Sequence, residues 1–385
     1  MKKAMNAFYA QSGGVTAVIN ATACGVIETS RKNKQVISNV YAGRNGIIGA
    51  LTEDMIDTNR ETKNTIHNLQ YMPGGVFGSA RYKLKSIKEN KAEYKRLIEV
   101  FKAHNIGYFF YNGGNDSMDT ANKISIMSKD MGFPIVSLGI PKTVDNDLPM
   151  TDNCPGFGSV AKYIAISTQE AALDVASMSK TSTKVFILEV MGRHAGWIAS
   201  AAGLVKKEKA DAPHIILFPE VPFEKKRFLS KVKESIKKYD YCVIVASEGT
   251  RYKNGSFLSD TGNKDAFGHA QLGGVAPILA QMISKNLNLK YHYAIADYLQ
   301  RSARHIASQL DVKQAYAVGQ AAVEMAIKGN NAVMPVIKRI SNKPYRWKID
   351  KTDLSKVANK EKMLPKKYIS KEGYAITKSC RDYLE

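Results

Sequence analysis

The chain has 385 residues, of which 44% are apolar and 24% charged, so it is long enough for two ordinary domains and too apolar to be mainly disordered. No apolar run reaches the roughly 18–20 residues that a membrane helix needs, and the N-terminus does not resemble a signal peptide, so we expect no membrane partner. Four widely spaced cysteines match no metal-binding spacing and indicate a reduced, cytoplasmic protein.

The formal net charge of +21 has two interpretations: an anionic partner, or a lysine-rich surface in contact with water. Residues 225–238 favour the second, because Phe228, Leu229, Val232 and Ile236 form an apolar stripe while the lysines face away. Aromatic residues do not interleave with the basic ones as a base-stacking surface requires, so we expect no nucleic-acid partner.

Buried strands are predicted where a short apolar run ends in a polar or glycine-bearing turn. The runs are residues 5–10, 106–111, 134–140, 185–190, 215–218 and 241–246, and helical patterns follow several of them. This alternation indicates an α/β fold with a parallel sheet covered on both faces. Ligands bind beyond the carboxyl ends of such strands, so the polar clusters found there are expected to form one site.

Two of these clusters are glycine loops that open a helix. In residues 11–14 the adjacent Gly13 and Gly14 either cradle a phosphate or make a tight turn. Residues 113–117 repeat the pattern and add Asp116. A carboxylate beside a phosphate loop implies a bridging Mg²⁺. The alternative is that Asp116 stands at the start of a helix because the helix dipole favours a negative charge there.

The segment from Lys142 to Asp147 is the strongest local signal. Asp145 and Asp147 can divide the work of accepting a proton and orienting its acceptor, while Lys142 and Thr143 can donate to phosphate. The alternative is a turn rich in Asp and Asn.

Three further clusters follow later strands. Arg193 is suited to stabilising charge on a phosphoryl group in transfer, and Glu248 either binds sugar hydroxyls or caps a helix. Arg301 and Arg304, three residues apart, suit a phosphate grip or a solvated helix face. Together these clusters indicate phosphoryl transfer, without the loops of the common nucleotide-binding motifs.

Six motifs occur in one order: Ser12-Gly13-Gly14, Gly78-Ser79-Ala80-Arg81, Gly113-Gly114-x-Asp116-Ser117, Thr143-Val144-Asp145-Asn146-Asp147, Met191-Gly192-Arg193 and Gln300-Arg301. This set resembles the 6-phosphofructokinase family over at least residues 5–320. The resemblance implies two similar three-layer α/β lobes with mainly parallel sheets and an active site in the cleft between them. Residues 1–150 and about 300–345 would bind the phosphoryl donor; residues 151–299 and the C-terminal segment would bind the sugar phosphate.

The resemblance also implies a role for each position. Asp145 would be the base that takes the proton of the sugar 1-hydroxyl, with Thr143 and Arg193 as the other catalytic residues. The donor positions are Gly14, Arg81, Asp116, Ser117 and Lys142, with Asp116 as metal ligand. The sugar positions are Thr143, Asp147, Lys184, Met191, Gly192, Arg193, Glu248, His292, Tyr298 and Arg301. Lys184, and His292 or the nearby Lys290, stand where relatives reach into a neighbouring subunit's site.

Two positions favour pyrophosphate as the donor. Asp116 and Lys142 stand where ATP-using relatives usually have glycine, and pyrophosphate-using relatives are similar to this sequence at both. A carboxylate at 116 would fill the space of a nucleotide α-phosphate and repel its charge, and Lys142 would attract the short pyrophosphate. Asn115 replaces the aspartate of most relatives and removes one metal-ligand position.

The expected function is therefore a Mg²⁺-dependent, reversible transfer from pyrophosphate to the 1-hydroxyl of fructose 6-phosphate in glycolysis, giving fructose 1,6-bisphosphate. The alternative is an ATP-dependent 6-phosphofructokinase. We expect a homodimer or homotetramer, and the intact catalytic positions argue against a silent regulatory subunit. The sequence leaves related sugar phosphates, such as sedoheptulose 7-phosphate, open as substrates.

Overall fold

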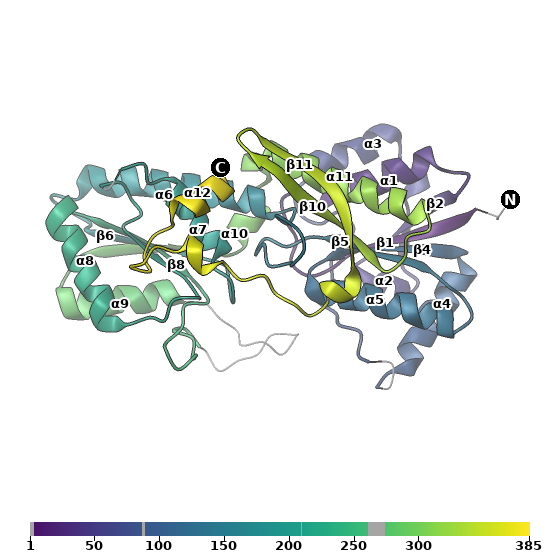
Figure 1. The fold of residues 1–385 in the computed structure, drawn as a ribbon, viewed down its shortest axis with the longest axis horizontal. Coiled ribbons are helices and arrows are strands. Elements are labelled where there is room, and N and C mark those ends of the chain that lie inside the picture. The colour runs from purple at the N-terminus through teal and green to yellow at the C-terminus, as the bar shows by residue number, and fades with distance from the viewer. Residues whose placement is uncertain (1–3, 87–88, 209, 261–273) are drawn as a thin grey trace. The chain divides into compact units, whose positions relative to one another are not determined.

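The computed structural model describes residues 4–86, 89–208, 210–260 and 274–385 (Figure 1). The chain forms two compact units. Unit 1 comprises Met1–Val144, Leu148–Ser159 and Ser302–Glu361, and unit 2 comprises Asp145–Asp147, Val160–Arg301 and Lys362–Glu385. The chain therefore passes from one unit to the other within the segment that carries the predicted base.

The described part of unit 1 contains a seven-stranded sheet in the order β11-β10-β5-β4-β1-β2-β3. Its strands are β1 (Met5–Gln11), β2 (Ile37–Gly43), β3 (Met55–Asp57), β4 (Ile106–Gly113), β5 (Val136–Pro141), β10 (Val333–Asn342) and β11 (Tyr345–Asp353). The neighbours from β10 to β2 are parallel, and the two edge strands, β11 and β3, pair antiparallel. The sheet is thus mainly parallel.

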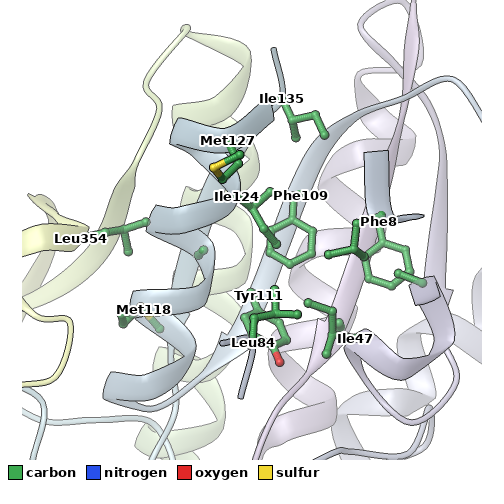
Figure 2. Packing of buried hydrophobic residues seen from close by; sticks show 14 of the residues in the cluster. Phe8, Ile47, Leu84, Phe109, Tyr111, Met118, Ile124, Met127, Ile135 and Leu354 are labelled. Atoms are coloured by element: carbon green, nitrogen blue, oxygen red, sulfur yellow. The ribbon is translucent and has the colours of Figure 1, made fainter. Parts of the chain in front are cut away.

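Helices cover both faces of this sheet. They are α1 (Ile19–Lys32), α2 (Ile47–Leu51), α3 (Lys63–Asn68), α4 (Lys91–Ala103), α5 (Asn115–Asp130) and α11 (Gln309–Ile327). Successive side chains of β1 alternate between the faces, so Phe8 packs against α2, α4 and α5, and Tyr9 packs against α1, α3 and α11. Figure 2 shows the first of these cores, where Phe8 and Phe109 stack with centroids 5.9 Å apart.

The described part of unit 2 contains a four-stranded parallel sheet in the order β7-β8-β6-β9. Its strands are β6 (Val185–Val190), β7 (Ile215–Leu217), β8 (Cys242–Ser247) and β9 (Tyr291–Ile295), and its helices are α7 (Trp197–Ala201), α8 (Lys225–Tyr239), α9 (Val275–Leu287), α10 (Asp297–Ser302) and α12 (Lys378–Leu384). α6 (Phe157–Met178) begins in unit 1 and continues in unit 2. Cys242 and Ile244 face α8 and α9, while Val243 packs against Ala172 of α6.

The fold-class prediction is confirmed, because each unit has a mainly parallel sheet between helical layers. The expectation of a single sheet from strand alternation was wrong. Residues 5–10, 106–111 and 134–140 correspond to β1, β4 and β5 of one sheet, whereas the three later runs correspond to β6, β7 and β8 of the other. Apolar runs predict strands but carry no information on which sheet each joins. Among the described residues, no helix combines the length and apolar character needed to cross a membrane.

Candidate functional site

The first glycine loop, after β1, is tied to the segment that carries Arg81. Gly13 has φ of +74°, a left-handed conformation that glycine adopts without a steric penalty. Its N–H donates to the Ala80 carbonyl at 2.9 Å, and the Ser79 hydroxyl donates to the Gly13 carbonyl at 2.6 Å. The two segments therefore run side by side, and Arg81 lies one residue beyond this pairing.

The second glycine loop joins β4 to the start of α5. A Cβ added to Gly113 would lie 2.0 Å from the Ser117 hydroxyl oxygen, so this position has room only for glycine. Ser117 is buried in the first turn of α5, and Gly114 caps that helix without a side-chain hydrogen bond. The first-turn N–H groups of a 16-residue helix favour an anion at this end.

Lys142, at the end of β5, connects both glycine loops. Its backbone N–H donates to the Gly113 carbonyl at 3.1 Å, and its Nζ donates to the Gly14 carbonyl at 2.7 Å. The residue is only 5% exposed. A Cβ on Gly13 would come within 3.4 Å of that Nζ. The side-chain amino group of Lys142 is therefore held against the first glycine loop.

Asp116 forms an ion pair with Lys83, whose Nζ lies 2.6 Å from the carboxylate Oδ1. The side chains are 31% and 47% exposed, respectively, so the pair lies in contact with solvent. No cluster of three or more His, Cys, Asp or Glu side chains suited to a metal occurs among the described residues. The donor set on unit 1 thus offers Asp116 as a single carboxylate. That arrangement suits Mg²⁺, which binds through one or two carboxylates together with substrate phosphates and water.

The segment from Thr143 to Asp147 passes from unit 1 to unit 2. Thr143 pairs with Gly156 in a short parallel bridge. Asp145 and Asp147 are half-buried, whereas Asn146 between them is fully buried with φ of +54°.

On unit 2, the loop after β6 is held by hydrogen bonds to its backbone. The Met191 N–H donates to Gln300 Oε1 at 3.2 Å, and the Gly192 N–H donates to Glu248 Oε1 at 3.3 Å. The Ser247 hydroxyl donates to the Gly192 carbonyl at 2.5 Å. Gly192 has φ of +130°, and a Cβ added to it would lie 2.8 Å from the Ala195 carbonyl oxygen. These contacts fix the backbone next to Arg193.

Burial raises the pKa of the Glu248 carboxyl, and the Gly192 amide and the Arg193 charge lower it in part. Burial likewise raises the pKa of Glu189 in β6, which accepts hydrogen bonds from the Gly274 and Ala276 N–H groups. Glu248 bonds to a loop amide rather than capping a helix, so of its two interpretations the structure excludes the cap.

Arg301 and Arg304 do not form a joint phosphate grip. The Arg301 guanidinium lies over the Tyr298 ring at 3.8 Å, on α10 of unit 2. Arg304 belongs to unit 1, where its Nη2 donates to the Gln70 carbonyl at 2.7 Å. The three-residue spacing was misleading because α10 ends between the two arginines, at Ser302.

The two residues expected to serve a neighbouring subunit differ in their surroundings. Lys184 precedes β6, and its Nζ lies 2.6 Å from an oxygen of Asp240 in the same chain. His292 is exposed on β9, which is an edge strand of its sheet. The structure therefore gives Lys184 a partner within its own unit and presents His292 at the surface.

Sequence reasoning missed several residues around these positions. Lys83 and Ser247 carry no motif, and only contacts through space connect them to Asp116 and Gly192. Gln300 belongs to the Gln300-Arg301 motif, but its hydrogen bond with Met191 joins residues 109 positions apart and could not be predicted from that motif. Tyr383 is likewise far in sequence from its partner Asn146. Only the tertiary structure shows that these residues contact the predicted site positions.

The fold and loops define an α/β protein with two glycine loops at strand ends in one unit and, in the other, a loop whose backbone donates to the Glu248 carboxylate. The phosphofructokinase family model matches residues 6–326, and the chain belongs to that family. It is 62% identical to the pyrophosphate–fructose 6-phosphate 1-phosphotransferase of Halomonas elongata, over 98% of this chain and 90% of that protein.

Two solved structures are also similar. The pyrophosphate-dependent phosphofructokinase of Marinobacter aquaeolei matches with a TM-score of 0.90 and 60% identity, over 99% of this chain and 90% of that one. The corresponding protein of Nitrosospira multiformis matches with a TM-score of 0.91 and 60% identity, over 99% and 91%. The resemblance inferred from the six motifs is thereby confirmed at the level of the family.

Proposed function

We propose that the protein transfers a phosphoryl group from pyrophosphate to the 1-hydroxyl of fructose 6-phosphate, reversibly, as a step of glycolysis. Its full-length similarity to pyrophosphate-dependent phosphofructokinases supports this function. The observation that carries the choice of donor is the buried Lys142, whose ammonium group lies against the Gly14 loop. A small, highly charged donor has no adenosine to bind, so fixed charge at its phosphates must supply the affinity.

The chemistry needs positioning and charge stabilisation, and no covalent intermediate. Asp145 takes the proton of the 1-hydroxyl as that oxygen attacks the terminal phosphorus of pyrophosphate, and orthophosphate leaves. Thr143 hydrogen-bonds the phosphoryl group in transfer, and Arg193 stabilises its negative charge. Gly14, Arg81 and Ser117 hold the donor, and Asp147 orients the base and the sugar.

Asp116 is the residue proposed to hold Mg²⁺. The ion, when bound, would neutralise the phosphate oxygens and polarise the bond that breaks. Lys83, whose Nζ lies 2.6 Å from Asp116 Oδ1, stands beside the residue that would hold the ion and would add a positive charge near the donor phosphates.

The sugar phosphate is proposed to bind the loops of unit 2. Met191, Gly192 and Glu248 would hold the sugar hydroxyls, and Arg301 with Tyr298 would hold the 6-phosphate. A charged carboxylate is a strong acceptor for hydroxyl groups, and a planar guanidinium matches phosphate oxygens. The position of Arg301 over the Tyr298 ring limits the rotamers of that arginine before substrate arrives.

We infer that a second copy of the chain completes the sugar site, in a homodimer or homotetramer. The β9 edge and the following helix expose large apolar side chains: Tyr293, Ile295, Tyr298 and Leu299 are 44–65% exposed. His292 and Lys184 would supply positive charge across that interface. Light scattering of the purified protein tests this inference; a monomer that retains full turnover contradicts it.

We also infer that the enzyme works in the cytoplasm. All four cysteines are free and buried. Burial raises the pKa of Cys242 to about 12, so this thiol stays protonated and unreactive at neutral pH. Thiols of this kind suit a reducing compartment, in which sugar phosphates are also retained.

The proposed function is tested by following the reaction with ³¹P NMR. Purified protein is mixed with fructose 6-phosphate, pyrophosphate and Mg²⁺, and then with fructose 1,6-bisphosphate and orthophosphate. We expect a C1 phosphate ester and orthophosphate in the first mixture and pyrophosphate in the second. Chelation of the metal should stop both reactions. A protein that leaves pyrophosphate intact in the presence of sugar phosphate and Mg²⁺ contradicts the proposal.

A further inference from the structure

The C-terminal segment contacts the loop that carries the proposed base. Asn146 lies between Asp145 and Asp147, and its side-chain Nδ2 donates to the Tyr383 hydroxyl at 2.9 Å. The N–H of Lys362 donates to the Asp147 carbonyl at 2.6 Å. We propose that Tyr383 is a positioning residue, which fixes the Asp145–Asp147 loop through Asn146 and so keeps the base in its reactive geometry.

The loop needs such support because of its backbone conformation. Asn146 has φ of +54°, in the left-handed region, which costs free energy for residues other than glycine. Its side chain is fully buried, so a hydrogen-bond partner for the amide group is required. Tyr383 supplies that partner from more than 230 residues away. This bond therefore uses one donor of the buried amide and holds the residue between the two carboxylates.

Tyr383 is itself held in place by an aromatic cluster. Its ring lies 5.2 Å from the Trp197 ring and 5.7 Å from the Tyr368 ring, between centroids. The Trp197 indole N–H donates to the Lys362 carbonyl at 2.9 Å, which ties the cluster to the residue that bonds Asp147. The ring of Tyr383 thus cannot move without disturbing these two aromatic neighbours.

The helix that carries Tyr383 is anchored in the turns that precede that residue. α12 has the side chain of Thr377 as its N-terminal cap, and Cys380 is fully buried. The Arg381 guanidinium donates to the carbonyls of Gly203 at 2.7 Å and Leu204 at 3.1 Å (Figure 1 shows α12 at the C-terminus). The hydroxyl of Tyr383 is therefore presented to Asn146 from a fixed frame.

This inference rests on the proposed function, because it needs Asp145 to be the base. A base displaced by about 1 Å can lose a large part of its effect even when substrates still bind. Removing the Tyr383 hydroxyl should therefore lower kcat more than it changes either KM. The expected loss is about 3- to 10-fold in kcat, the range that one neutral hydrogen bond supports.

The test compares Tyr383→Phe with Tyr374→Phe. Both changes remove one hydroxyl from the C-terminal segment and keep the ring, but Tyr374 packs in the core beside α8 and α9, away from the loop. Asp145→Asn serves as the reference for loss of the base. We expect Tyr383→Phe to lose kcat with little change in KM for either substrate, and Tyr374→Phe to match the wild type.

A double-mutant cycle with Asn146→Gly sharpens the test. Glycine keeps the left-handed conformation and removes the amide that reaches Tyr383. If the two residues act through one bond, the double variant loses no more kcat than the worse single variant. Additive losses contradict the proposal, as does wild-type kcat in Tyr383→Phe, or an equal loss in Tyr374→Phe.

Each other outcome is also decisive. If Asp145→Asn retains full turnover, the assignment of the base fails, whatever Tyr383→Phe does. If Asp145→Asn is inactive and Tyr383→Phe is normal, only the positioning role fails. Should Tyr383→Phe not fold, Asn146→Gly alone decides: a lowered kcat at unchanged KM supports the proposal, and wild-type kcat overturns it.

Discussion

The proposed donor loops of unit 1 and the proposed sugar loops of unit 2 hold their backbones with groups of opposite charge. In the proposed donor loops of unit 1, Lys142 is a buried ionisable side chain, and it bonds the Gly14 carbonyl. In unit 2 the corresponding groups are the carboxylates of Glu189 and Glu248, each bonded to backbone N–H groups. Each unit therefore presents the charge that suits its ligand: a cation for phosphates, and acceptors for hydroxyl groups.

The buried carboxylates of unit 2 should also respond to pH. Burial raises the pKa of both Glu189 and Glu248, so these carboxylates take up protons more easily than exposed ones. Acid should therefore weaken the hydrogen-bond acceptors of the sugar side.

The largest expected effect is on the base. Asp145→Asn should lower kcat by roughly 10²–10⁴-fold, because the amide cannot accept the proton of the attacking hydroxyl. KM for fructose 6-phosphate and pyrophosphate should change little, since the loops of both units remain intact. Steady-state kinetics measures both constants, and a variant that keeps more than half of the wild-type kcat contradicts the assignment.

The next largest effect is expected on the choice of phosphoryl donor. The double change Asp116→Gly and Lys142→Gly should lower kcat/KM for pyrophosphate by roughly 10- to 100-fold, since a hydrogen bond from a charged group contributes about 1.5–3 kcal/mol. The same variant should gain measurable turnover with ATP. KM for the sugar phosphate serves as the control and should stay near the wild-type value. If ATP remains inert, other groups enforce the choice of donor.

A smaller effect tests the pH difference. Glu248→Gln should raise KM for fructose 6-phosphate and remove the part of its pH dependence that comes from this carboxyl. In the wild type that KM should rise as the pH falls through the raised pKa, because the neutral acid is a weaker acceptor. KM for pyrophosphate should not follow this profile. Parallel profiles for the two substrates would show that the comparison is wrong.

The same carboxyl makes a prediction about stability. The folded state binds the Glu248 proton more tightly than the unfolded chain, whose carboxyl has its ordinary pKa of 4.5. The contribution of this group to the free energy of unfolding is therefore greatest below pH 4.5 and declines as the pH rises through the raised pKa. Denaturant unfolding of wild type and Glu248→Gln across pH 4–8 measures it.

A last effect, on stability and not on turnover, lies outside both sets of loops. His214 is buried beside the rings of Tyr239 and Tyr241, and burial lowers its pKa to about 4 from 6.5. The unfolded chain takes up this proton first, so the free energy of unfolding should fall by up to about 3 kcal/mol between pH 6.5 and 4, at 1.36 kcal/mol per pKa unit.

His214→Asn isolates this contribution, because asparagine can still accept the Val243 N–H that now bonds Nδ1 at 3.0 Å. The stability difference between the variant and the wild type should be constant above pH 7 and should shift in favour of the variant as the pH falls toward 4. Parallel acid unfolding curves for the two proteins would contradict the role assigned to His214.

The sequence predicted the strands that have continuous apolar runs and the residues that sit at their ends. β6 was predicted with its observed bounds, and the motif residues Gly13, Gly113 and Lys142 lie together as expected. β9 was missed because its side chains are mostly exposed and show no apolar run. The β10–β11 hairpin was missed because its outer part alternates between half-buried and exposed residues and shows no continuous apolar run.

Long-range contacts account for what the sequence could not predict in the site. Arg304 was grouped with Arg301 by spacing, but only the fold shows that it bonds the Gln70 carbonyl in the other unit. Lys83 and Tyr383 reach Asp116 and Asn146 from distant segments, through bonds that no local pattern encodes. Motifs therefore predicted the reacting residues, and tertiary structure shows which residues contact them.

The central claim is the choice of pyrophosphate as donor, and it can be tested directly on the wild-type protein. Initial rates of fructose 1,6-bisphosphate formation are measured with fructose 6-phosphate and Mg²⁺, once with pyrophosphate and once with ATP. The account predicts turnover with pyrophosphate and none above background with ATP. Turnover with ATP alone would keep Asp145 as the base and contradict the roles given to Asp116 and Lys142.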